Sequence, residues 1–300
     1  MTRAAARMLD ERRLHLQDGP IDLIVEARGT PDSIQSAYTA AATRFSTALG
    51  ELCDELALIR SEVSKYRPPE GPIARRMWSA VLPFAPHCFI TPMAAVAGSV
   101  ADEILEAMAA AAGITRASVN NGGDIALLLK GKETVKIGLV DRPDRPSLFG
   151  SATLSAADNV GGIATSGWRG RSFSLGIADA VTVLARDAAM ADAAATFIAN
   201  AVDLPGHPAV HRVPAASLQP DSDLRDMPVT RGVGPLGPED VMRALDAGVA
   251  AAEAVIAAGL IVAAALHLAG TTRTAGNAAW NAYLAPLKGP VAAINRRLSP

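Results

Sequence analysis

The stretch Ala117-Ser-Val-Asn-Asn-Gly-Gly-Asp-Ile-Ala-Leu-Leu-Leu129 places two short apolar runs on either side of a double-glycine turn. This pattern is typical of two antiparallel β-strands joined by a tight connection. Similar short runs follow at 135–140, 151–154, 162–165 and 180–184, and turns rich in Gly, Asp and Pro separate most of them. Strands this short and this closely spaced favour an antiparallel sheet over parallel strands with crossover helices.

Helical patterns precede and follow these strands along the sequence. The remaining expected elements are a hairpin of runs 13–17 and 21–26, helices at 30–65, 74–82, 92–113 and 190–202, a Pro-rich loop at 203–226, a strand at 228–233 and a final helix at 237–268. Cap residues, prolines and glycines at the ends set these boundaries. Runs of strands mixed with a few long helices predict an α+β fold, an antiparallel sheet with long packing helices.

The chain length fits one domain or two, and we expect one. The expected domain covers 1–270 and comprises a hairpin and helix (13–65), a core (89–202) and the final helix (237–268). Residues 271–300 are expected to form a C-terminal extension.

The composition excludes several classes of protein. Half of the 300 residues are apolar, which excludes bulk disorder, and a net charge of −2 gives no field that would attract nucleic acid. The apolar run 254–268 is about 15 residues, short of the roughly 20 that cross a bilayer, so we expect a buried helix and no membrane partner. Cys53 and Cys88 form no metal or disulfide pattern. Because the charged N-terminus lacks a Sec-type signal pattern, we expect a cytoplasmic protein.

The double-glycine turn is the first candidate ligand site. Gly122 and Gly123 carry no Cβ, so their backbone amides can approach a phosphate or ribose, with Asn121 and Asp124 beside them. The alternative is a plain hairpin turn in which Asn and Asp act as turn residues.

The second candidate site is the stretch from Gly161 to Ser174. A small apolar strand there leads into Thr165 and Ser166, then into Arg169 and Arg171. Two guanidinium groups could clamp an anion. The alternative is a solvated loop with surface arginines.

Asp192 and Thr196 form the third candidate site. They lie four residues apart on one helix and therefore share a face, so both could give an oxygen to one Mg²⁺ ion. The alternative is that Asp192 sits favourably in the first helical turn while Thr196 packs.

In this order, the three segments resemble the ApbE superfamily of magnesium-dependent FAD:protein FMN transferases. The matching segments are 94–102, 119–125, Ala164-Thr-Ser-Gly167 and Ala191-Asp192 with Thr196. The runs 13–22, 89–98 and 171–183 resemble the uncharacterised UPF0280 branch more closely still. The resemblance implies a T-fold-like, ApbE-like architecture, Mg²⁺ at Asp192 and Thr196, and FAD or FMN as ligand.

Two parts of the transferase pattern are missing. The lysine expected after Ala97 is absent, and the His-Ile-Ile-Asp-Pro-Arg-Thr-Gly segment has no counterpart between Gly167 and Ala180. Pyrophosphate cleavage needs cations on the transferred group, so these gaps argue against FMN transfer.

We therefore expect a protein that binds a small anionic, flavin-derived ligand and Mg²⁺. Its site would combine Asn121, Gly122, Gly123, Thr165, Ser166 and Arg171 with the Asp192/Thr196 pair, and Asp179 or Asp124 would be the base. Two alternatives stay open: an accessory protein of sulfur and homocysteine metabolism, and a non-catalytic homo-oligomer built around an Ala-rich final helix.

Overall fold

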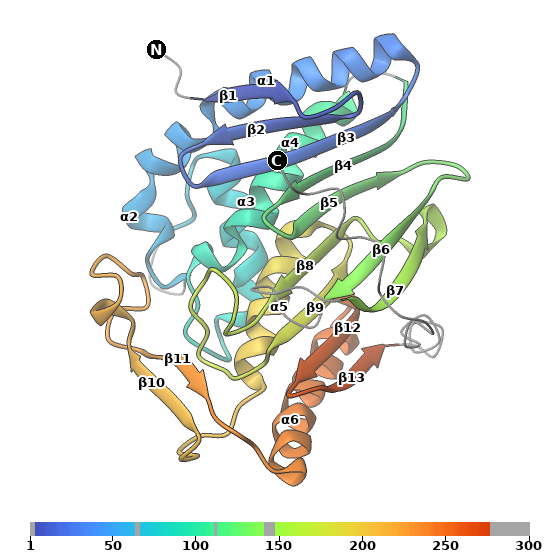
Figure 1. Cartoon of the computed structure of the whole chain (residues 1–300). Coiled ribbons are helices and arrows are strands. Elements are labelled where there is room, and N and C mark those ends of the chain that lie inside the picture. Colours follow the sequence, from blue (N-terminus) through green and yellow to red (C-terminus); the bar gives the residue numbers. More distant parts are fainter. Residues whose placement is uncertain (1–3, 64–66, 111–112, 141–147, 277–300) are drawn as a thin grey trace.

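The structure, a computed structural model, describes residues 4–63, 67–110, 113–140 and 148–276. Its centre is a nine-stranded sheet (Figure 1). In spatial order the strands are β1 (Ala5–Met8), β2 (Arg13–Asp18), β3 (Ile21–Gly29), β4 (Ile114–Asn121), β5 (Asp124–Leu129), β8 (Gly162–Ser166), β9 (Ala180–Ala185), β12 (Ile261–Leu268) and β13 (Thr271–Gly276). All neighbouring pairs are antiparallel, so the expected antiparallel sheet is confirmed.

Two small sheets extend from this centre. β6 (Thr134–Val140) and β7 (Leu148–Ser155) form a hairpin whose Leu154 packs with Leu127 and Leu184 of the main sheet. β10 (Val210–Pro214) and β11 (Pro228–Val233) form a second pair. β10 falls in the predicted Pro-rich loop 203–226, so that prediction was wrong for these five residues.

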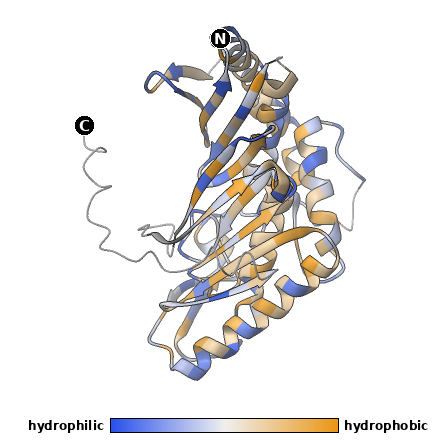
Figure 2. Cartoon of the chain, turned by 90° about the vertical axis from the view of Figure 1, so that its right-hand side faces the viewer, coloured by the Kyte–Doolittle hydropathy of each residue, from blue (hydrophilic) through white to orange (hydrophobic). Residues whose placement is uncertain are grey.

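The helices gather on one face of the main sheet, as the edge-on view of Figure 2 shows. They are α1 (Pro31–Asp54), α2 (Leu56–Ile59), α3 (Pro72–Val81), α4 (Val96–Ala110), α5 (Ala188–Ala201) and α6 (Pro238–Ala257), with short 3₁₀ turns at Leu82–Phe84, Pro92–Ala95, Ala156–Asp158 and Ala215–Ser217. Their buried faces meet the sheet in two large apolar clusters, one around Phe45 and Ile104 and one around Ile177 and Ile198. No helix within the described ranges is both long and apolar enough to span a membrane.

The expected final helix 237–268 is corrected by the structure. α6 ends at Ala257, Gly259 adopts a left-handed conformation (φ +73), and the apolar residues that follow form β12 between β9 and β13. Almost every β12 side chain is buried. A strand covered on both faces gives a continuous apolar run, which periodicity cannot distinguish from a buried helix.

The main sheet continues past residue 270, where the C-terminal extension was expected to begin. Thr271–Gly276 pairs along its whole length with β12, so these residues belong to the main sheet and not to the extension predicted at 271–300. Residues 277–300 lie outside the described part of the chain.

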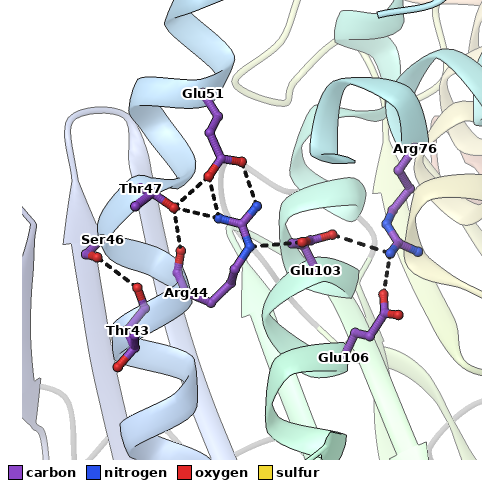
Figure 3. A network of polar contacts seen from close by, with 8 residues as sticks. All are labelled: Thr43, Arg44, Ser46, Thr47, Glu51, Arg76, Glu103 and Glu106. Carbon is purple, nitrogen blue, oxygen red and sulfur yellow. Dashed lines mark hydrogen bonds and ion pairs between the residues drawn. The ribbon is translucent and has the colours of Figure 1, made fainter. Parts of the chain in front are cut away.

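A chain of ion pairs fixes α1, α3 and α4 to one another (Figure 3). Arg44 of α1 pairs with Glu51 at 2.6 Å and with Glu103 of α4 at 2.9 Å. Arg76 of α3 approaches Glu103 at 3.4 Å and Glu106 at 2.6 Å. Glu103 is thus shared by two arginines from different helices, so the network fixes how α4 lies against its neighbours.

Candidate functional site

A two-lobed cleft opens between the sheet and the start of α4. The first lobe has a volume of about 370 Å³ and is called the polar lobe here. Its lining is Ala97, Gly122, Asp124, Thr165, Ser166, Gly167, Arg169, Gly170, Arg171, Ser172, Asp192 and Thr196. The second, of about 290 Å³, is called the apolar lobe here after Phe89, Met93, Phe173 and Phe197 in its walls. Its lining also includes the polar residues Arg60, Thr91, Asn200, Gln219, Asp221, Ser222 and Asp223. The residues that line both lobes are Ala97, Asp124, Arg171, Ser172, Asp192 and Thr196.

Asp192 lies where α4 and α5 meet. Its Oδ2 accepts a hydrogen bond from the Gly98 amide at 3.0 Å, at the start of α4. In return, Asp102 of α4 accepts from the amides of Ala188 and Ala189 at the start of α5, at 3.0 and 2.8 Å. Each helix thereby carries the carboxylate that caps the other, which favours a fixed crossing. Burial raises the pKa of Asp102 to about 6.

The close crossing depends on Gly98. A Cβ at this position would come within 2.1 Å of the Ala188 carbonyl oxygen, far inside van der Waals contact. The glycine therefore lets the two backbones approach until the Gly98 amide reaches Asp192. The lysine of the transferase pattern would fall at this position, where the structure has no room for any side chain.

Asp124 faces the same cleft as Asp192. It follows the double-glycine turn, and its Oδ1 accepts a hydrogen bond from the Thr165 amide at 3.2 Å. Burial, opposed by the Thr165 hydrogen bond and the Arg171 charge, raises the pKa of Asp124 to about 7. Burial first, and then the Asp124 charge, raise the pKa of Asp192 well above its ordinary value. Asp124 can therefore hold or release a proton near neutral pH, and the two carboxylates could share a cation that removes their repulsion.

Gly122 provides space for Arg171. Gly122 has φ +66, and a Cβ on it would lie 1.9 Å from Arg171 Nη2. The guanidinium therefore lies directly over the turn, on the lining of both lobes. Arg169 also lines the polar lobe, but its Nε donates to Asp179 at 2.7 Å and its guanidinium lies 4.1 Å from the Trp168 ring centroid, so it is already engaged.

The strand β8 contributes the Thr165 and Ser166 lining, and the two side chains leave it on opposite faces. Thr165 Oγ1 is 2.9 Å from Thr182 Oγ1 of β9, so this hydroxyl is engaged within the sheet. Ser166 is half-buried and lines the polar lobe, and Thr196 lines both lobes.

Two residues of the turn do not line the lobes, as far as the described residues show. Asn121 is buried, and its Nδ2 donates to the Ala97 carbonyl at 3.1 Å, which anchors the start of α4 to β4. The Gly123 amide donates to Asn120 Oδ1 at 2.8 Å, so it is already engaged. Asn121 and Gly123 therefore shape the cleft without facing it.

Asp179 likewise lines neither lobe within the described chain. Its carboxylate accepts hydrogen bonds from Trp168 Nε1 at 3.2 Å, Arg169 Nε at 2.7 Å and the Ala269 amide at 2.8 Å. It ties the Arg171-bearing loop to the β12–β13 turn. Sequence reasoning treated it as a base because it stands in a recognisable motif, and pattern alone does not show which way a carboxylate faces.

The apolar lobe was missed at the sequence level. Its walls come from the segment before α4, from α5 and from the tip of the β10–β11 pair. Arg60 pairs with Asp221 of that tip at 3.0 Å, 161 residues away in the chain. One signal was available: Asn200 continues the four-residue spacing of Asp192 and Thr196 along α5.

Asp124, Asp192 and Thr196 are the residues of the cleft that could hold a divalent cation. No group of three or more His, Cys, Asp or Glu side chains lies together in the described ranges. The half-buried side chains of Asp124, Asp192 and Thr196 nevertheless line the polar lobe, and Mg²⁺ commonly keeps waters and takes only one or two carboxylates. A cation between Asp124 and Asp192 would offset the charge that burial penalises.

A family model matches most of the chain. The model of a family described as AbpE bacteria matches residues 5–274. A UPF0280 protein of Methanopyrus kandleri is 36% identical over 171 residues, covering 56% of this chain and 66% of the relative. Another from Methanocella arvoryzae is 37% identical over 174 residues, covering 57% and 64%. The chain thus spans just under two thirds of the length of these relatives.

Solved structures give weaker likenesses. The flavin transferase ApbE from Vibrio cholerae is 12% identical, covers 93% of this chain and 99% of that chain, and has a TM-score of 0.40. The flavinyl transferase ApbE of Pseudomonas stutzeri is 13% identical, covers 86% and 77%, and has a TM-score of 0.36. These TM-scores are too low to bear on the chemistry of the cleft.

Proposed function

The chain belongs to the AbpE bacteria family, and on that premise we propose that its cleft binds a small anionic, flavin-derived ligand together with Mg²⁺. The resemblance of the sequence to the UPF0280 branch is confirmed by its curated relatives. The observation that carries the proposal is that Asp124, Arg171, Asp192 and Thr196, from three distant segments, line both lobes of one cleft.

Asp124, Asp192 and Thr196 are the residues that would hold the cation. The pKa values of both carboxyls are raised, chiefly by burial, and the charge of Asp124 adds to the rise at Asp192. Mg²⁺ would supply positive charge that draws a phosphate oxygen into the polar lobe. Asp192 keeps one oxygen on the Gly98 amide, so the cation would use the other.

Arg171 is the residue that would meet the anion. Its guanidinium lies over Gly122 and lines both lobes, and Arg–phosphate contacts are short and charge-assisted. Arg169 is not proposed as an anion ligand, because its Nε already donates a hydrogen bond to Asp179. Asp179 is accordingly proposed as a positioning residue, and Asp124 as a cation ligand rather than a base.

FMN transfer is not proposed. The transferase lysine is replaced by Gly98, where a Cβ would meet the Ala188 oxygen at 2.1 Å. Among the described residues, Cys88 is the only cysteine that lines the cleft. Burial raises the pKa of its thiol, which makes it a poor nucleophile. T-fold topology, a cytoplasmic location and a homo-oligomeric state stay predictions. The helix α6, which was expected to pack between subunits of a homo-oligomer, buries Leu245 and Val249 in the core of its own chain.

Calorimetric titration tests the proposed function. FMN and FAD are titrated with and without MgCl₂ into the wild type, into Asp192→Asn and into Asp246→Asn, an exposed matched control far along α6. We expect Mg²⁺ to tighten FMN binding at least tenfold, about 1.4 kcal/mol, in the wild type and the control only. The same magnesium dependence in Asp192→Asn would refute the metal role, and no binding of either flavin would refute the ligand class.

A further inference from the structure

Three polar residues of α5 form one stripe along the cleft. Asp192, Thr196 and Asn200 follow one another at intervals of four, so they share a helical face. Asp192 and Thr196 line both lobes, whereas Asn200 lines only the apolar lobe of the two. The stripe therefore continues from the proposed cation site to a carboxamide that lines the apolar lobe.

The orientation of the Asn200 carboxamide is fixed by its neighbours. Its Oδ1 accepts hydrogen bonds from the Leu175 amide at 2.9 Å, Ser174 Oγ at 3.2 Å and the Gly176 amide at 3.4 Å. A backbone N–H can only donate, so the oxygen must face this segment. The Nδ2 group, with two N–H donors, is therefore directed away from the loop.

The 174–176 loop is packed tightly enough to keep its hydrogen bonds to Asn200 Oδ1. A Cβ on Gly176 would lie 2.1 Å from the Ala199 carbonyl oxygen, so the loop is packed directly against α5. Ser174 and Gly176 are also buried. A carboxamide held on one side by a packed backbone presents its donors in one direction, which is the preorganisation that a specific recognition group needs.

The surroundings of Asn200 in the apolar lobe define what it can recognise. Phe173 and Phe197 contribute aromatic walls to this lobe, which suit a planar ring system. A donor pair at the edge of such a lobe is satisfied by a ring carbonyl or an unprotonated ring nitrogen. A ring without an acceptor would leave the Nδ2 donors desolvated and unpaired, at a cost in affinity.

We propose that Asn200 is a specificity-determining residue: its Nδ2 group donates to an acceptor atom of a planar heteroaromatic ring in the apolar lobe, while the phosphate of the same ligand occupies the polar lobe. This inference rests on the proposed function and narrows its ligand class. It selects phosphorylated heteroaromatics with a ring carbonyl or ring nitrogen over simple aryl phosphates of the same charge.

The test compares two probes on two proteins. FMN carries a phosphate and ring acceptors, whereas phenyl phosphate carries the same phosphate on a ring without acceptors. Asn200→Asp keeps the accepting oxygen and replaces the donors with a second acceptor. Its added negative charge weakens both probes similarly, so the ratio of the two affinities isolates the ring contact.

We expect the preference for FMN over phenyl phosphate to fall at least tenfold in Asn200→Asp. An unchanged ratio overturns the role of Asn200 and leaves the proposed function standing, while a wild type that binds neither probe overturns both. Thermal melting reports folding of the variant. Should Asn200→Asp fail to fold, the same ratio is measured with Asn200→Ser, which removes the carboxamide donors without adding a charge.

Discussion

The substitution Gly98→Ala tests the crossing of α4 and α5 on which the cleft depends. The new methyl would lie 2.1 Å from the Ala188 oxygen, about 1.3 Å short of ordinary contact at 3.4 Å. Its neighbours there are backbone atoms of α5, so the clash cannot be relieved by a side-chain rotation. The two helices must separate by on the order of 1 Å.

The expected cost combines overpacking with lost hydrogen bonds. Overpacking a tight site costs about 1–3 kcal/mol. Separation also lengthens the bonds from Gly98 to Asp192 and from Ala188 and Ala189 to Asp102, each worth about 1 kcal/mol or more where buried. If all three bonds are lost, we expect a loss of about 4–6 kcal/mol in the free energy of unfolding, together with loss of Mg²⁺-dependent FMN binding.

Urea denaturation measures the change, and Gly50→Ala is the matched control. Gly50 lies inside α1 with nothing within 4 Å of its would-be Cβ, so alanine there should add roughly 0.5–1 kcal/mol to the free energy of unfolding. If Gly98→Ala costs less than about 1 kcal/mol, the close crossing does not exist as described and the reasoning fails.

Three further predictions concern the charges and the turn. Burial raises the pKa of Asp124 to about 7 and that of Asp192 above its ordinary value, so a cation that binds to these carboxylates must displace protons. Below about pH 7, the affinity for Mg²⁺ should therefore fall about tenfold per pH unit for each proton that the cation displaces. Titration of the protein with MgCl₂ between pH 8 and pH 5.5 measures this dependence. A pH-independent affinity would contradict this. Gly122→Val should displace Arg171 and weaken phosphate binding about tenfold, as measured by calorimetry; unchanged binding would remove the anion role of Arg171. Glu103→Ala should lower the free energy of unfolding by about 2 kcal/mol in urea, since two half-buried arginines lose their shared partner (Figure 3); a change below about 0.5 kcal/mol would show that the network contributes little.

Local signals predicted much of the sheet and part of the cleft. The hairpin of β2 and β3 and the pair of β4 and β5 follow from alternating runs around glycine turns, and all of these strands formed where expected. Asp192 and Thr196 share a helix face as their spacing required, and they meet Asp124 and Ser166 at one cavity. Spacing along one element is local information, and the sequence carries it directly.

What failed depended on tertiary surroundings. The 261–268 run gave no period because a central strand is buried on both faces. The base role of Asp179 stays a prediction, and the sequence does not show that its carboxylate accepts hydrogen bonds from Trp168, Arg169 and the Ala269 amide. Asn200 was overlooked because its donors become available only when the 174–176 loop, distant along the chain, occupies its oxygen.

The most direct measurement of the central claim is anomalous diffraction from crystals grown with MnCl₂ and FMN. Manganese substitutes for magnesium at oxygen ligands and reports its own position. The account predicts a manganese peak within coordinating distance of the Asp192 and Asp124 carboxylates and the Thr196 hydroxyl, with the FMN phosphate beside it and the ring in the apolar lobe. Flavin density in the cleft with manganese elsewhere, or manganese at Asp192 with the flavin outside the cleft, would contradict it.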